Sequence, residues 1–237
     1  MQAITPQDII EYSKCPKKLY FSLSYKEKMI SPRFEFQIIS DVIKSVYLYA
    51  LRKEKFTPWN LIPGWVDRAA NNFTIDLSDI ERYKKSENIL VRLSYWYNNI
   101  YLAQENLSGF INVPIYYPID YHRVYYDKID ILEIGQQVRI LDFTEEDIGP
   151  VNLYKEMLIH IKSWGLNVSC KSKPDKYVRL VIKPLSIKIV EISVTNDMIK
   201  KAEKISYHIL SGIKNQIFYP SITKQCPSCP YMDLCEI

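Results

Sequence analysis

The chain has 237 residues, of which 47% are hydrophobic and 24% charged, and its formal net charge is +4. This composition is ordinary for a globular protein and excludes a low-complexity chain. There is no apolar run of membrane-spanning length and no secretory signal, so we expect a cytoplasmic protein without a membrane partner. Acidic residues predominate over 126–147, whereas basic residues predominate from Lys171 onwards. That distribution suits a cation site that faces a polyanion, but two solvated faces of opposite sign would also produce it.

The first part of the chain, residues 1–108, has the pattern of a helical region. Thr5 precedes Pro6 as an N-cap precedes a proline in the first turn, and Pro16 ends this helix and begins the next. Further on, apolar residues recur at helical spacing. We therefore predict helices that begin at Pro6, Pro16 and Ser31, loops with short helices over 57–77, and a helical region over 76–104. No catalytic constellation is visible in this part of the sequence.

The composition changes at Gly109, after which segments rich in Ile, Val and Tyr alternate with short polar interruptions. They predict strands over 110–118, 121–133, 137–144, 177–183 and 186–193. We also predict a helix from Pro150 to Trp164 that Gly165 terminates, a short strand over 167–169, and a last helix over 196–213. This order predicts an α/β fold around a mixed sheet, with a core over 109–214 and a C-terminal segment over 215–237.

Two aspartates follow apolar runs in neighbouring predicted strands. The tight turn expected at Gly135 and Gln136 would place Asp130 and Asp142, each near the end of its strand, at the same level of the sheet. Two carboxylates there could share a Mg²⁺ or Mn²⁺ ion. Aspartates at strand ends are also common turn formers, so the spacing by itself leaves both interpretations open.

Four of the five cysteines form a pattern typical of metal ligands. Cys226, Cys229 and Cys235 form a C-x2-C-x5-C cluster, and Cys15 is the natural fourth ligand. Thiolates bind zinc or an iron–sulfur cluster, and the spacing does not distinguish the two. Such a centre would hold the two ends of the chain together. Cys170 stands alone and is expected to be a free thiol, and without a secretory signal no disulfides are expected.

Two motifs at the ends of the chain carry a family resemblance. They are Tyr12-Ser-Lys-Cys15-Pro-Lys-Lys-Leu-Tyr20 and Cys226-Pro-Ser-Cys229-Pro-Tyr-Met-Asp-Leu-Cys235. Together with the strand pair that carries the two aspartates, they resemble the iron–sulfur CRISPR-associated exonucleases, the fourth CRISPR-associated protein family. The resemblance implies the RecB-like PD-(D/E)XK nuclease fold, a mixed sheet flanked by helices. It also implies a 4Fe–4S cluster on the four cysteines, and metal-dependent trimming or selection of DNA before a CRISPR integrase inserts it as spacers.

The nuclease motifs of that family are only partly matched. Its Gly-x-x-Asp corresponds to a segment that ends at Asp130, and its Asp/Glu-x-Lys corresponds to Asp142-Phe-Thr144, where threonine replaces the lysine. Ser40 or Asp41 stands where the family has a metal-binding histidine. Since one preorganised charge in such a site is worth on the order of a hundredfold in rate, these departures predict weakened or lost nuclease activity.

Other residues could restore parts of this site. The candidates for the missing lysine by position are Lys128, Lys155 and Lys183. The family's Gln-x3-Tyr motif is replaced by Glu156-x3-His160, and Glu156 could join the two aspartates as a catalytic carboxylate.

DNA contacts are expected from the basic C-terminal half of the chain. The candidates are Lys171, Lys173, Lys176, Arg179, Lys200 and Lys201. We predict a DNA-binding CRISPR adaptation protein that acts with the integrase on DNA that is single-stranded or carries overhangs. The alternatives are an active nuclease with a rearranged site and a zinc-stapled structural module. A homo-oligomer is left open, and the usage of Ile, Lys and Tyr suits an archaeal source.

Overall fold

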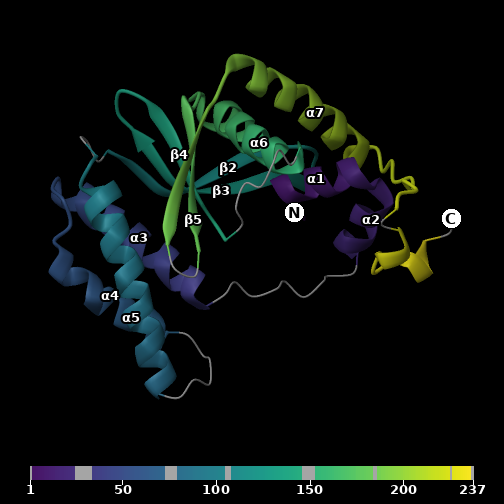
Figure 1. Ribbon diagram of the computed structural model, residues 1–237. Coiled ribbons are helices and arrows are strands. Elements are labelled where there is room, and N and C mark those ends of the chain that lie inside the picture. Colours follow the sequence, from purple (N-terminus) through teal and green to yellow (C-terminus); the bar gives the residue numbers. More distant parts are fainter. Residues whose placement is uncertain are drawn as a thin grey trace.

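A six-stranded mixed sheet lies between two layers of helices in the computed structural model (Figure 1). The structure describes residues 2–24, 34–72, 79–104, 108–145, 153–183, 186–224 and 226–235. The strands are β1 (Gln2–Ile4), β2 (Gly109–Pro118), β3 (Arg123–Ile134), β4 (Val138–Thr144), β5 (Lys176–Ile182) and β6 (Ile187–Ser193). The helices are α1 (Pro6–Lys14), α2 (Pro16–Ser24), α3 (Phe34–Lys53), α4 (Ile62–Asn71), α5 (Asp79–Trp96), α6 (Leu153–Cys170) and α7 (Asn196–Lys214). Short helical turns follow at Trp59–Leu61, Tyr97–Tyr101, Cys226–Ser228 and Met232–Leu234. No described helix is long and apolar enough to cross a membrane.

β3 is the strand on which the sheet is built. β2 pairs antiparallel with one edge of β3 along most of its length. The other edge is shared, because β1 runs parallel to β3 over 123–125 and β4 runs antiparallel to it over 131–134. β5 then pairs parallel with β4, and β6 pairs antiparallel with β5. On the shared edge, residues 126–130 have no strand partner among the described residues, so the sheet opens there.

Each face of the sheet has its own hydrophobic core. Helices α1, α6 and α7 cover one face, where Tyr125, Trp164 and Tyr177 are completely buried. Helices α3, α4 and α5 cover the other, where Tyr47 and Trp96 are buried. We call these two sides the α6 face and the α3 face. Figure 1 shows the two helical layers on opposite sides of the sheet.

Most of the predicted elements are confirmed, and so is the mixed sheet flanked by helices. The predicted strands match β2 to β6 within a few residues, and α1 and α2 begin at the two expected prolines. Thr5 caps α1 as expected: its hydroxyl accepts a hydrogen bond from the N–H of Asp8, whose carboxylate accepts one from the N–H of Thr5. The expected helix starts at Ser31 and Pro150 lie outside the described residues. The sequence does not predict β1, because three residues are too few to show a strand pattern.

The prediction that Gly165 ends a helix is wrong. α6 continues to Cys170, so residues 167–169 are helical and do not form a strand. Gly165 instead permits a close approach, because a Cβ atom there would lie 2.9 Å from Oη of Tyr125 and 3.0 Å from its Cε1. The absent side chain lets α6 lie directly against β3.

We predict that Gly165→Ala lowers the free energy of unfolding by about 1 kcal/mol. Crowding that costs about 1–3 kcal/mol exceeds the roughly 1 kcal/mol that alanine gains over glycine within a helix. Gly64→Ala in α4 is the matched control, since no atom lies within 4 Å of the new methyl group. It should raise the free energy of unfolding by about 0.5–1 kcal/mol.

Urea unfolding of both variants measures the difference. Adding Tyr125→Phe to Gly165→Ala should recover part of the loss, because it removes the nearest crowding atom. A Gly165→Ala variant as stable as the wild type would refute the crowding argument.

Candidate functional site

The site lies where β3 and β4 separate. Their pairing ends at Ile131 and Leu141, so the next residue on each strand, Asp130 on β3 and Asp142 on β4, stands level with the other. Asp130 lies well inside β3, and not near its end as expected. The structure thus brings together the two carboxylates that the hairpin pattern places at one level of the sheet.

The regular alternation of side chains between the two faces of the sheet is interrupted in β3 at Asp130. Ile129 packs into the core of the α6 face, whereas Ile131 packs into the core of the α3 face. In a regular strand, residues two apart point to the same face. β2 is distorted at the same level, because Asn112, opposite Asp130 in the register, has a left-handed backbone with a φ of 57°. Such backbone is uncommon outside glycine and concentrates at functional sites. At this break in the alternation, side chains from the helices of both layers can approach Asp130.

One lysine from each helical layer binds a carboxylate of the pair. Nζ of Lys44, on α3, lies 2.5 Å from Oδ1 of Asp130. Nζ of Lys162, on α6, lies 3.1 and 3.2 Å from the two carboxylate oxygens of Asp142, and 3.8 Å from Oδ1 of Asp127. We call these five residues the carboxylate cluster.

The pKa values of the two central aspartates are shifted in opposite directions. Burial by itself raises the pKa of Asp142, but the ammonium of Lys162 and a 2.5 Å hydrogen bond donated by Tyr177 outweigh it, so that pKa is lowered. Burial and the negative charge of Asp142 raise the pKa of Asp130. Asp142 is therefore the stronger acid of the two. Burial lowers the pKa of Lys162, but Asp142 and Asp127 raise it further, so Lys162 stays charged.

The two aspartates offer a donor set for a divalent cation. Mg²⁺ usually keeps several waters and takes one or two carboxylates together with phosphate oxygens. Within the described ranges, no three His, Cys, Asp or Glu side chains converge closely enough to hold a metal ion by themselves. Lys44 already neutralises Asp130, so a cation would compete with its ammonium group.

The lysine that is absent from position 144 has a counterpart on α6. Lys162 places a positive charge beside Asp142, which Thr144, two residues further along β4, cannot do. Lys162 is not among the lysines proposed from the sequence, because the chain does not show which residues of a helix face the strands. A signal was present in the sequence, since Lys162 lies within the largely apolar segment 157–166.

Of the three lysines proposed from the sequence, the two whose side chains are described lie elsewhere. Lys128 is exposed, and only its backbone N–H contacts the carboxylate of Asp127. Lys183 follows β5 near α5, where its carbonyl accepts a hydrogen bond from Arg92. The side chain of Lys155 lies outside the described residues.

Glu156 lies on a different side of α6 from Lys162. The six residue steps from one to the other turn the helix so that the two side chains point about 120° apart. Burial lowers the pKa of His160, and Glu156, one turn away, partly offsets this effect. Glu156 is not among the groups that dominate the pKa of either central aspartate. Its catalytic role stays a prediction.

The two α3 residues at the expected histidine position do not form part of the cluster. Ser40 is buried and donates a hydrogen bond to the carbonyl of Gln37, and Asp41 is exposed. Lys44, one turn further along α3, lies next to Asp130 in their place.

The predicted DNA-binding residues differ in exposure. The exposed members are Lys171, Lys173, Lys200 and Lys201. Lys176 forms an ion pair of 2.9 Å with Glu191. Arg179 lies on the internal strand β5 with only 4% of its surface exposed, so it is not part of the exposed basic surface, and its contact with DNA stays a prediction.

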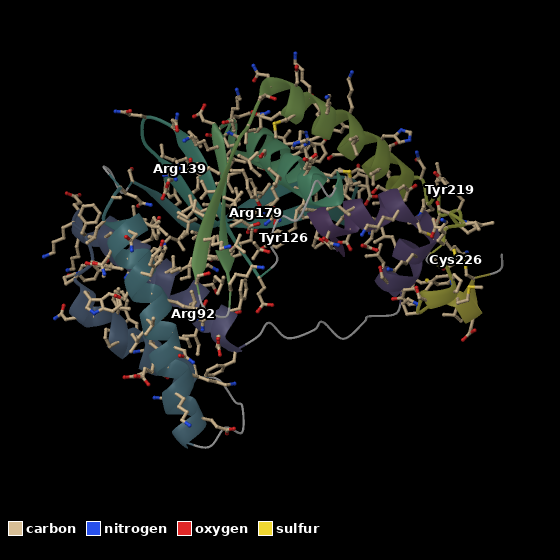
Figure 2. All side chains as sticks on the ribbon, viewed as in Figure 1. Arg92, Tyr126, Arg139, Arg179, Tyr219 and Cys226 are labelled. Carbon is tan, nitrogen blue, oxygen red and sulfur yellow. The ribbon has the colours of Figure 1, made fainter. Side chains whose placement is uncertain are left out.

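Four cysteines line one pocket beside α2, in the region where Figure 2 labels Cys226. They are Cys15, Cys226, Cys229 and Cys235. Ser221 joins two of them, because its N–H donates to Sγ of Cys15 at 3.5 Å and its carbonyl accepts from Sγ of Cys226 at 3.8 Å. Burial and the neighbouring Cys15 and Cys229 raise the pKa of Cys235. None of the five cysteines forms a disulfide, and the fifth, Cys170, is exposed.

Hydrogen bonds outside the pocket also hold the two chain ends together. Oη of Tyr12 donates to the carbonyl of Ile217 at 2.6 Å, and the N–H of Lys17 donates to the carbonyl of Tyr219 at 3.1 Å. Gly212 makes room for Tyr12, since a Cβ atom at this position would overlap its hydroxyl. These contacts place the C-terminal cysteines against the first two helices.

Comparison with known proteins relates this chain to others by fold. No protein-family model matches it, and no curated protein matches its sequence. A solved structure of a Eubacterium rectale protein described as a candidate exonuclease matches 99% of this chain and 93% of its own, with 11% identity and a TM-score of 0.57. A protein described as SSO0001 matches 100% of this chain and 87% of its own, with 12% identity and a TM-score of 0.44. The chain therefore shares the fold of the Eubacterium rectale protein over nearly its whole length.

We predict that Asp127→Asn gains stability relative to the wild type as pH rises from 4 to 7.5. Oδ2 of Asp127 is buried without a partner, and burial raises the pKa of its carboxyl to about 6, although Lys162 opposes the shift. Because the folded pKa exceeds the unfolded one, ionisation of Asp127 destabilises the folded state as pH passes through this range. Asparagine avoids that cost, so the difference should change by about 1–3 kcal/mol.

Urea unfolding in metal-free buffer at the two pH values measures this change. A difference in free energy of unfolding that is the same at both pH values would contradict the raised pKa of Asp127.

Proposed function

We propose that the protein is a metal-dependent DNA nuclease of weakened activity that prepares DNA for CRISPR integration. The observation that carries this proposal is the carboxylate cluster, in which Asp130, Asp142 and Lys162 meet from three elements at one point of the sheet. The fold shared with a protein described as a candidate exonuclease supports it. The CRISPR context rests on the resemblance of the two terminal cysteine motifs.

Each residue of the cluster has a role in this proposal. A bound Mg²⁺ or Mn²⁺ ion would supply a water of lowered pKa and polarise the phosphate. Asp130 and Asp142 would hold the ion. Lys162 orients Asp142 from one side and Tyr177 from the other, and Lys162 keeps a positive charge at the centre.

Lys44 is the reason to expect weakened activity. Its ammonium lies 2.5 Å from Asp130 and competes with a cation for that carboxylate. This ion pair also favours a second candidate function, a protein that binds DNA and selects it without cleavage.

We further propose that the four pocket cysteines hold a 4Fe–4S cluster. A single zinc ion with Zn–S bonds of about 2.3 Å needs its sulfur ligands within about 4 Å of one another. The larger cluster is favoured by the resemblance of the two cysteine motifs, and all four cysteines line one pocket. The N–H groups of Ser221 and Thr223, which donate to Cys15 and Cys226 at 3.5 and 3.3 Å, would support thiolates.

We propose DNA that is single-stranded or carries overhangs as the substrate and a CRISPR integrase as the partner. The exposed lysines Lys171, Lys173, Lys200 and Lys201 would contact phosphates, and this binding would weaken steeply with salt. The integrase partner rests on the family resemblance alone.

Manganese-dependent cleavage of single-stranded DNA by the anaerobically purified protein tests the nuclease function. We expect Asp142→Asn and Lys162→Met each to reduce the rate by about a hundredfold or more, because each removes a preorganised charge. Asp67→Asn, on the exposed side of α4, is the matched control and should cleave like the wild type.

Lys44→Met tests whether the ammonium beside Asp130 weakens cation binding. It should tighten Mn²⁺ binding about tenfold, if the lost competition is worth about 1.4 kcal/mol. DNA binding without cleavage, in both the wild type and Lys44→Met, would reject the nuclease and favour the second candidate.

Iron, sulfide and zinc analysis tests the cluster. We expect about four iron and four sulfide ions per wild-type chain, and almost none in Cys229→Ala. Cys170→Ser is the matched control, because Cys170 is exposed at the end of α6 and should not affect the iron content. Zinc in place of iron would refute the cluster and favour a zinc-stapled module.

A further inference from the structure

Arg179 extends a row of charged residues that crosses the sheet. In the register of β4 and β5, Asp142 is paired with Arg179, just as it stands level with Asp130 on its other side. Arg179 shares a face with Tyr177, two residues earlier on β5, whose hydroxyl binds Asp142. Asp130, Asp142 and Arg179 therefore occupy neighbouring positions on three adjacent strands. Figure 2 shows Arg179 in the central sheet, well away from Cys226.

The guanidinium of Arg179 is buried without a counter-ion in the described structure. Only 4% of the residue is exposed, and Nε and Nη1 are buried without a hydrogen-bond acceptor. The neighbouring carboxylate of Asp142 is already engaged by Lys162 and Tyr177. A guanidinium keeps its proton in proteins, so the charge persists. A buried charge without a partner is strongly unfavourable, which makes this position receptive to an anion.

Two other arginines near the sheet have carboxylate partners. Arg92 lies 2.5 Å from Glu35. Arg139, on β4, lies 2.9 and 2.7 Å from two glutamates. Figure 2 labels all three arginines. The absence of a partner is therefore particular to Arg179 among these three.

We propose that Arg179 binds a phosphate group of the DNA at the carboxylate cluster. This inference rests on the proposed nuclease function and names the residue that receives the phosphate. The planar guanidinium can bind two phosphate oxygens at once. Lys162 is held between Asp142 and Asp127, so it orients the carboxylates. Arg179, in contrast to Lys162, forms no ion pair with a described carboxylate, so its guanidinium can receive the phosphate.

The position of Arg179 also fits the gap left at residue 144. Thr144 is paired with Val181 in the register, two residues beyond Arg179 on β5. Residues 179 and 181 share one face of the strand. Besides Lys162 on α6, a second positive charge is therefore present beside this position, one strand away on β5. There it neutralises the phosphate and stabilises the charge that develops on it.

Thermal unfolding in metal-free buffer, with and without inorganic phosphate, tests the anion site directly. Phosphate should raise the Tm of the wild type, because a ligand that binds only the folded state stabilises it. It should not change the Tm of Arg179→Gln, and it should shift that of Arg179→Lys only weakly, since lysine keeps the charge without the planar fork. Arg139→Gln is the matched control, an ion-paired arginine on the adjacent strand, and should keep the wild-type phosphate shift.

Cleavage of single-stranded DNA with Mn²⁺ gives a second measurement, in which Arg179→Gln should lower kcat by about a hundredfold. Absence of cleavage in both the wild type and Lys44→Met, together with a phosphate shift that requires Arg179, would reject the nuclease function and keep the anion site. Three results would overturn the inference: no phosphate shift in the wild type, an unchanged shift in Arg179→Gln, or wild-type cleavage by that variant. An unchanged shift together with a lower Tm in Arg179→Gln would assign Arg179 a structural role.

Discussion

The burial of charge where β3 and β4 separate is the constraint on which the rest of the structure depends. Three carboxylates at this point would be strongly unfavourable without counter-ions. Lys44 and Lys162 provide them, and because these lysines come from α3 and α6, the same ion pairs fix one helix of each layer to the sheet. The interrupted alternation of β3 at Asp130 makes this possible, since it lets lysines from the helices on both faces approach the carboxylate cluster.

The same charge compensation shapes the chemistry that the site can perform. The lysine beside Asp142 comes from a helix and not from the strand that carries the aspartate, so its distance from the carboxylate depends on how closely α6 lies on the sheet. Gly165, three residues beyond Lys162, permits that closeness by leaving room for Tyr125. On the other side, Lys44 occupies the carboxylate that a cation would need. The carboxylates of this arrangement are therefore partly neutralised by the protein's own lysines.

The molecule separates its two candidate centres. The cysteine pocket joins the first two helices to the segment after α7, at the side of the molecule where Figure 2 labels Tyr219 and Cys226. The charged row of Asp130, Asp142 and Arg179 crosses the middle of the sheet. A centre at the chain ends can stabilise the fold without taking part in chemistry at the row.

Local patterns in the sequence by themselves determined the elements, the pairing of two strands and the set of cysteines. Apolar periodicity depends on near neighbours in the chain, and a short hairpin leaves few registers, so Asp130 and Asp142 could be placed level with each other. Only the tertiary structure decided which cations meet them. Lys44 lies on an early helix and Lys162 on a later one, and nothing local to either shows which carboxylate it will contact. From the sequence, Gly165 resembles a helix terminator and Arg179 resembles one of several surface cations. The residue type gives the chemistry of a side chain but does not show which elements pack against it.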